Sequence, residues 1–254
     1  MFAAGPLPHV KPFLGPAFAW VAAVQGGAAM VPPWAVRIPL KWICIMLKRC
    51  NHRVCAPLPG SPPGDLFRVD AKAEGDDLAV IGGWAVGGGQ GHGSAAWFSH
   101  RIRAAEFPWV FEKGRPFKVI AALELLAVLY GIMLLVPEGD YRGAVGRVPI
   151  TAGTGNQGNR HLVRKMLTTK YPLFLVAMEL AAQLTERNID LRLDWRPREK
   201  NMEADALTNE AFDGFDPARR LDAAGVHSRF IRRPELEVAT REWRRGRLVE
   251  VKAT

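Results

Sequence analysis

Residues 66–86 read "LFRVDAKAEGDDLAVIGGWAV", and the domain architecture is predicted most directly from this segment. Apolar and polar residues alternate over Phe67–Ala71, which predicts a strand with one buried face. The next residues, "AEGDD" at Ala73–Asp77, are typical of a turn, and Leu78–Val86 is rich in β-formers. A third strand is predicted at Ala95–Ile102. Three strands in succession predict an antiparallel meander at the start of the domain.

Helices and strands alternate after this meander. The apolar spacing and the runs of strong helix formers predict four helices and two further strands. In chain order these are a helix at Lys118–Leu135, a strand at Arg147–Thr151, helices at Gln157–Thr168 and Pro172–Arg187, a strand at Ile189–Trp195 and a helix at Asn201–Asn209. The order β-β-β-α-β-α-α-β-α predicts an α/β domain with a mixed five-stranded sheet flanked by helices.

Composition is that of a globular protein with a polyanionic partner. At 254 residues the chain is long enough for one core of ordinary size plus extensions. A formal net charge of +9 favours polyanions, of which nucleic acid is the commonest. The basic end of the chain fits either a solvated arm or a phosphate-contacting segment, and its cations are Arg241, Arg244, Arg245, Arg247 and Lys252.

Three cysteines, Cys44, Cys50 and Cys55, lie in one short stretch. An odd count, with no secretory leader at the first residues, predicts an intracellular protein of the cytoplasm or nucleus. Together with His52 the cysteines allow a zinc site, but their spacing matches no usual two-plus-two pattern. We therefore expect unpaired thiols.

Two apolar stretches are long enough to be compared with membrane spans. Phe13–Ala35 is uncharged but contains prolines, glycines and a glutamine, which suit a spanning helix poorly. Val119–Pro137 is more hydrophobic, but Glu124 lies inside it, and a carboxylate is costly in lipid. No membrane partner is expected.

Three of the predicted elements each contain an acidic residue at a position where a shared site could form. Asp70 lies in the first strand, Glu124 lies in the first turns of the long helix, and Asp205 lies one turn after Asn201 in the last helix. Each alone is explained more simply as a solvated surface acid. Together they point to a shared site, because buried carboxylates need a positive counter-charge and Mg²⁺ supplies one through oxygen ligands.

From Leu66 to Asn209 the chain resembles the type 1 ribonuclease H domain that follows retroelement reverse transcriptases, in particular DIRS-like and protist elements. Four segments are similar to family motifs: "FRVDAKAEG" at 67–75, "IAALELLAVL" at 120–129, "ITAGTGNQGN" at 150–159 and "WRPREKNMEADALTN" at 195–209. The second and fourth are the most specific. The resemblance implies a ribonuclease H-like fold and hydrolysis of the RNA strand of an RNA–DNA hybrid with two Mg²⁺ or Mn²⁺ ions.

The resemblance assigns Asp70, Glu124 and Asp205 as catalytic metal ligands, and it also shows a departure from the family pattern. Gly155 stands where the family has its third aspartate, so a side-chain oxygen ligand is missing and we expect impaired hydrolysis. The loop Arg196–Asn201 also lacks the histidine that many ribonucleases H have there. The residues expected to bind nucleic acid are Asn156, Gln157, Arg196, Arg198, Lys200 and Asn201.

The resemblance also suggests how the chain is divided. Residues 1–60 are similar to the region that joins a polymerase thumb to ribonuclease H, and "LPGSPPGD" at Leu58–Asp65 predicts a linker. The domain itself is expected at 66–210, followed by a basic extension at 211–254. Expected partners are an RNA–DNA hybrid or other nucleic acid and the rest of a retroelement polymerase. A catalytically inactive nucleic-acid-binding module and a retroelement relic without a role remain as alternatives.

Overall fold

The computed structural model divides the chain into two compact units. One contains Met1–Val54, Met166–Ala182 and Ile231–Thr254, and the other contains Cys55–Lys165 and Gln183–Phe230. The structure describes residues 8–24, 31–49, 64–86, 92–112, 114–137, 146–231 and 236–242. The predictions for Cys50, His52, Cys55 and the cations from Arg244 onward, and most of the predicted linker, lie outside the described residues.

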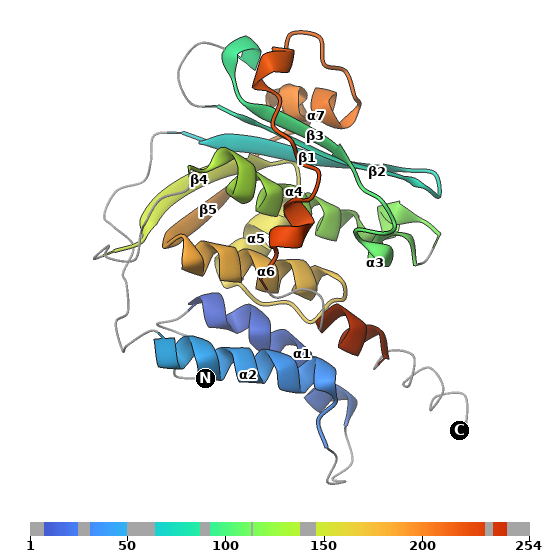
Figure 1. Ribbon diagram of the computed structural model, residues 1–254, viewed down its shortest axis with the longest axis vertical. Coiled ribbons are helices and arrows are strands. Elements are labelled where there is room, and N and C mark those ends of the chain that lie inside the picture. The colour runs from blue at the N-terminus through green and yellow to red at the C-terminus, as the bar shows by residue number, and fades with distance from the viewer. Residues whose placement is uncertain are drawn as a thin grey trace. The chain divides into compact units, whose positions relative to one another are not determined.

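The second unit is built on one mixed five-stranded sheet in the order β3-β2-β1-β4-β5 (Figure 1). The strands are β1 at Phe67–Glu74, β2 at Leu78–Ala85, β3 at Trp97–Arg101, β4 at Val148–Thr154 and β5 at Ile189–Trp195. β2 pairs antiparallel with both β1 and β3, whereas β4 pairs parallel with both β1 and β5. This arrangement confirms the predicted mixed sheet and the ribonuclease H-like fold.

The helices follow the predicted order. After the meander come α3 at Pro108–Phe111, α4 at Ile120–Leu135, α5 at Gln157–Lys165, α6 at Leu173–Glu186 and α7 at Met202–Thr208. Short 3-10 turns lie at Pro8–Val10, His92–Ser94, Pro116–Val119, Arg198–Lys200, Pro217–Arg219 and Val226–Arg229. The predicted helices at α4, α5, α6 and α7 are confirmed, and the single turn of α3 between the meander and α4 was not predicted.

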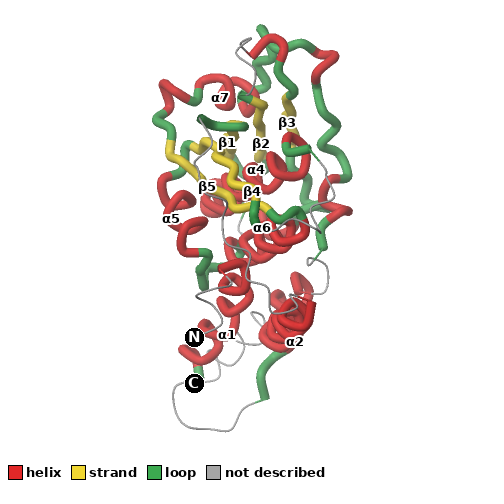
Figure 2. Tube along the Cα trace, turned by 90° about the vertical axis from the view of Figure 1, so that its left-hand side faces the viewer, coloured by secondary structure: helices red, strands yellow, loops and turns green. Residues whose placement is uncertain are grey.

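Helices α4 and α7 cover opposite faces of the sheet (Figures 1 and 2). On one face, a Cβ atom built on Gly82 would lie 2.8 Å from the Cβ of Leu207 in α7. Asp70 pairs directly with Gly82 and shares this face, because side chains that are opposite each other in a ladder point the same way. On the other face, Phe67 of β1 packs against Gly131 of α4. The two helices can therefore deliver side chains to one strand from two sides.

Helix α4 is the core helix of this unit. It contacts β1 and β2, and most of its residues are buried, including Leu123, Leu126 and Leu129. Among the described residues, Pro116–Leu135 is the one helical stretch long and apolar enough to cross a membrane, and 67% of that window is buried inside the structure. Core helices of globular domains commonly have the same composition.

A second apolar cluster lies on the α7 face and uses residues beyond position 210. It consists of Trp84, Ala95, Trp97, Ala204, Leu207 and Phe215. The following segment runs along β3, where the Leu221 amide donates to the Trp97 carbonyl at 2.7 Å and Arg220 forms a parallel bridge with Trp97. The fold of this unit therefore includes residues that follow α7.

The first unit contains α1 at Lys11–Ala23 and α2 at Trp34–Arg49. The two helices contact each other, with Phe13 of α1 and Trp42 of α2 packed edge to face at 6.2 Å between ring centroids. Helix α1 was not predicted, because Pro16 lies inside it and interrupts the helical pattern.

Candidate metal and nucleic-acid site

The proposed site lies where β1 and β4 stop pairing. Their last paired residues are Val69 and Thr154, so Asp70 and Gly155 are the first residues beyond the shared ladder. One pocket of about 410 Å³ is lined by both of them together with Glu124 and Asp205. The fold thus brings the four sequence-predicted positions, separated by up to 135 residues along the chain (205 minus 70), to one place.

Asp70 is a mostly buried acid with few compensating contacts. The Thr208 hydroxyl donates to its Oδ2 at 3.3 Å. Burial, followed by the negative charge of Asp205, raises the pKa of Asp70 to about 6, while hydrogen bonds from the Ala71 amide and Thr208 act in the opposite direction. This carboxylate is therefore held in a state that favours a proton or a cation.

Glu124 is more deeply buried, with 7% of its surface exposed. The Thr154 hydroxyl donates to its Oε2 at 3.3 Å, and Thr154 is itself fully buried. Burial and then the charge of Asp70 raise the pKa of Glu124 well above its usual range. No ion pair to Glu124 occurs in the described part of the chain, so its charge lacks a protein counter-charge.

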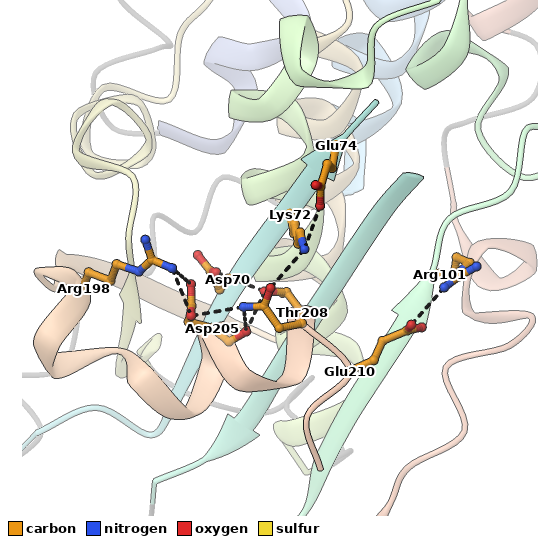
Figure 3. A network of polar contacts seen from close by, with 9 residues as sticks. Asp70, Lys72, Glu74, Arg101, Arg198, Asp205, Thr208 and Glu210 are labelled. Atoms are coloured by element: carbon orange, nitrogen blue, oxygen red, sulfur yellow. Dashed lines mark hydrogen bonds and ion pairs between the residues drawn. The ribbon is translucent and has the colours of Figure 1, made fainter. Parts of the chain in front are cut away.

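Asp205 has protein partners of its own (Figure 3). Arg198 lies 3.1 Å from its Oδ1, and the Asn209 amide donates to its Oδ2 at 3.1 Å. Lys72 donates to the Asn209 Oδ1 at 3.0 Å and also pairs with Glu74 at 2.9 Å. A cation from the Arg198 loop and a cation from β1 thus both belong to the polar network around Asp205.

Gly155 leaves space beside the carboxylates of Asp70 and Glu124. A Cβ atom at this position would lie 3.3 Å from the Asp70 Oδ1 and 3.9 Å from the Glu124 Oε1. Its backbone carbonyl accepts a hydrogen bond from the Trp195 ring nitrogen at 3.1 Å. A side chain at 155 would therefore point toward the same carboxylates that the resemblance assigns to metal.

A divalent metal ion fits Asp70 and Glu124 by the chemistry of their donor atoms. Hard cations bind carboxylate oxygens, and neither the half-buried Asp70 nor the buried Glu124 forms an ion pair with a cation of the described residues. In the ranges that the structure describes, no three His, Cys, Asp or Glu side chains form a ready ligand group. Asp205 is paired with Arg198, and the second ion expected from the resemblance has no carboxylate at position 155.

Of the six residues predicted to contact nucleic acid, the structure places two at the pocket and four outside it. Arg198 and Asn201 line the pocket, whereas the other four do not. Arg196 forms a two-pronged ion pair with the buried Asp65, at 2.6 and 2.8 Å. Asn156 accepts a hydrogen bond from the amide of Asn159 in the first turn of α5. The two that remain outside the pocket with exposed side chains are Gln157 and Lys200.

Sequence reasoning missed three polar residues of the pocket, Lys72, Thr208 and Asn209. The sequence spacing of each residue from Asp70 or Asp205 would have predicted its place beside that acid. Lys72 lies two residues after Asp70 and therefore on the same face of β1. Thr208 and Asn209 lie three and four residues after Asp205, on the same side of the last helix and its end.

Replacing Asp70 by Asn is expected to stabilise the metal-free chain at neutral pH. The carboxyl ionises near pH 4 when unfolded but near pH 6 when folded, so the unfolded state loses the proton first as pH rises. Stability therefore falls between pH 4 and 6, by about 3 kcal/mol for this group, and stays lower above that range. Asp70→Asn removes this loss, which corresponds to a rise in Tm of roughly 6–10 °C at pH 8.

The measurement is thermal unfolding in chelator at pH 4.5 and pH 8. The gain from Asp70→Asn should shrink strongly at the lower pH. Asp76→Asn, in the exposed turn between β1 and β2, is the matched control and should change little at either pH. An equal effect of Asp70→Asn at both pH values would contradict the assigned cause.

Comparisons with known proteins found similarity among solved structures. No family model matches the sequence, and no curated protein matches it. Among solved structures, the ribonuclease H1 of the halophilic archaeon Halobacterium salinarum NRC-1 is 20% identical over 58% of this chain and 96% of its own, with a TM-score of 0.38. LC11-RNase H1, isolated from compost, is 23% identical over 58% and 94%, with a TM-score of 0.39.

A further structure, LC11-RNase H1 in complex with an RNA/DNA hybrid, is 25% identical over 58% of this chain and 95% of its own, with a TM-score of 0.32. The ribonuclease H-like fold is assigned from the order and direction of the five strands.

Proposed function

We propose that the chain is a ribonuclease H-like domain of a retroelement polymerase that acts on RNA–DNA hybrids, with hydrolysis impaired by Gly155. The observation that carries the proposal is that the half-buried Asp70 and the buried Glu124, whose pKa values are both raised, line one pocket together with Asp205. Burying acids together is unfavourable unless a cation binds there. Perturbed acids that converge in a pocket are typical of catalytic sites.

The residues around the pocket have separable roles in this proposal. Asp70 and Glu124 hold the divalent cation, and Thr154 orients Glu124 through its hydroxyl. The bound ion supplies positive charge that offsets the acids and stabilises charge that develops on a phosphodiester. Lys72 and Arg198 add two cations at the rim, suited to backbone phosphates on either side of the reacting one. The reaction is hydrolysis of the RNA strand, with water as the nucleophile, leaving a 3′-hydroxyl and a 5′-phosphate.

A catalytically inactive nucleic-acid-binding module is the second candidate. Two observations favour it: position 155 has no carboxylate, and Asp205 is already paired with the exposed Arg198. Such a module would keep the basic rim and bind a hybrid without cutting it.

Cleavage and binding of a labelled RNA–DNA hybrid test both candidates. The full chain is assayed with Mg²⁺ and with Mn²⁺ beside Asp70→Asn and Glu124→Gln. Slow cleavage that both substitutions abolish supports the nuclease. Binding without cleavage, in the wild-type chain and both variants, supports the module. A folded chain that neither binds nor cleaves the hybrid would contradict both candidates.

The retroelement origin rests on the four motif resemblances and has a separate test. Sequencing the genomic locus on the 5′ side of this coding region should reveal a reverse-transcriptase reading frame. A locus flanked by unrelated genes would argue for a free-standing ribonuclease H-like protein instead.

A further inference from the structure

Helix α2 has one buried face and one basic face. Its buried side chains are Ala35, Val36, Pro39, Ile43 and Met46, which recur at helical spacing. The exposed side carries Arg37, Lys41 and Lys48. These three are four and seven residues apart, so they form a stripe about 16 Å long at 1.5 Å per residue.

No acidic side chain on this segment competes for the stripe. The first 64 residues of the chain contain neither Asp nor Glu. Within the described residues, none of the three cations forms an ion pair. An uncompensated row of cations is unusual for a face that only meets water, because surfaces normally mix both signs.

An exposed tryptophan stands at the start of the stripe. Trp34 is 61% exposed, and the Arg37 guanidinium lies 4.4 Å from the centroid of its ring. Aromatic rings beside cations are the combination used to bind single-stranded nucleic acid, where phosphates meet the cations and bases stack on the rings.

We propose that this face of α2 binds single-stranded nucleic acid, with Arg37, Lys41 and Lys48 on successive backbone phosphates and Trp34 stacked on an unpaired base. Charge complementarity selects a polyanion. An anionic membrane fits less well, because a helix at a membrane surface inserts its apolar face. The largest apolar face of α2 is already buried, and Trp42 packs against Phe13 of α1, which leaves Leu40 and Leu47, at 37% and 38% exposed, as the apolar side chains beside the stripe. The proposal does not depend on the carboxylate pocket.

The main test is binding of a fluorescein-labelled oligouridine to the full chain in the presence of chelator, followed by anisotropy over a range of salt. Arg37→Gln/Lys41→Gln/Lys48→Gln should weaken binding at low salt by about tenfold or more. It should also reduce the slope of log K against log salt by about 2, since each phosphate contact on a single strand contributes about 0.7. The Tm of this triple variant, and of the control variant described next, must equal that of the wild-type chain, so that lost binding does not report unfolding.

The matched control removes the same charge from another helix. Arg160→Gln/Arg164→Gln/Lys165→Gln changes three exposed cations of α5 and should alter affinity and slope much less. Equal losses in the two triple variants would overturn the assignment to α2, because they would report bulk charge alone.

Two further measurements address the contacts directly. Trp34→Ala should weaken oligouridine binding by about tenfold, the effect of one lost stacking contact, and Trp34→Phe should restore most of it. Cys44 is exposed between Lys41 and Lys48, so saturating oligouridine should slow its alkylation by iodoacetamide, read by peptide mass spectrometry. An unprotected Cys44 would overturn the proposal. So would an α2 triple variant that keeps oligouridine binding but loses binding to phosphatidylserine vesicles.

Discussion

Gly155→Asp is expected to raise cleavage of an RNA–DNA hybrid by the full chain at least about a hundredfold. A carboxylate at this position would be directed at Asp70 and Glu124, because the Cβ atom lies 3.3 and 3.9 Å from their oxygens. Each 1.4 kcal/mol of recovered transition-state stabilisation is a factor of ten, and a complete metal site contributes several kcal/mol. The backbone of Gly155 is not left-handed, so the Asp side chain needs only a small rotation of the Asp70 carboxylate.

Gly155→Asp should also change the thermal stability of the chain, which is measured independently of cleavage. Without metal, a further acid beside two acids of raised pKa should lower Tm, and Mg²⁺ should restore it. Gly155→Asn is the matched control, since it has nearly the same size and no charge. It should cut the hybrid no faster than the wild-type chain and should gain no Mg²⁺ response beyond that of the wild-type chain. If Gly155→Asp stays inert while folded and Mg²⁺-responsive, the site binds metal but is not a nuclease site.

Gly131→Val is expected to lower the free energy of unfolding by about 3–4 kcal/mol, a fall in Tm of about 10 °C. Gly131 is where α4 crosses β1, and a Cβ atom there would overlap the ring of Phe67. Both residues lie in the core, and Phe67 is fully buried, so its ring has no free space to enter. The valine must push helix and strand apart.

This displacement should also weaken the candidate site. Glu124 lies seven residues before Gly131 and therefore on nearly the same face of α4, so both depend on the close approach to β1. Metal binding by Gly131→Val/Gly155→Asp should be weaker than by Gly155→Asp alone. Phe67→Leu is the diagnostic partner, because a smaller side chain should relieve part of the overlap. Strictly additive losses for Phe67→Leu and Gly131→Val would show that the two do not contact.

Local pattern was sufficient to predict the strands, most of the helices and the sheet. Its errors lie at ends that depend on distant pairing. β4 was expected to end at Thr151, but it continues to Thr154 because its small residues pair in parallel with β5 up to Trp195. The extension matters, since it places Gly155 directly after the strand. Small residues such as Ala152 and Gly153 have little strand propensity of their own, so only the partner strand reveals this end.

The acidic residues of the candidate site could be predicted from the sequence. The ion pairs and hydrogen bonds around the site could not. The motif resemblance located Asp70, Glu124 and Asp205, which the structure brings to one pocket. No local signal predicts that Arg196 pairs with Asp65, which is distant in sequence and lies just before the first strand. That ion pair lowers the pKa of Asp65 despite its burial. Partner choice of this kind depends on tertiary structure, which periodicity does not describe.

The segment that runs along β3 has a consequence for solubility. An outer strand of a sheet exposes unpaired amide and carbonyl groups that recruit strands from other molecules and so start aggregation. Here the Trp97 carbonyl accepts from Leu221 and the Ser99 carbonyl accepts from Arg220, so two of these groups are occupied. Fragments designed for expression must therefore extend past α7 and include Arg220 and Leu221. A shorter fragment would expose the edge of β3 and would tend to aggregate.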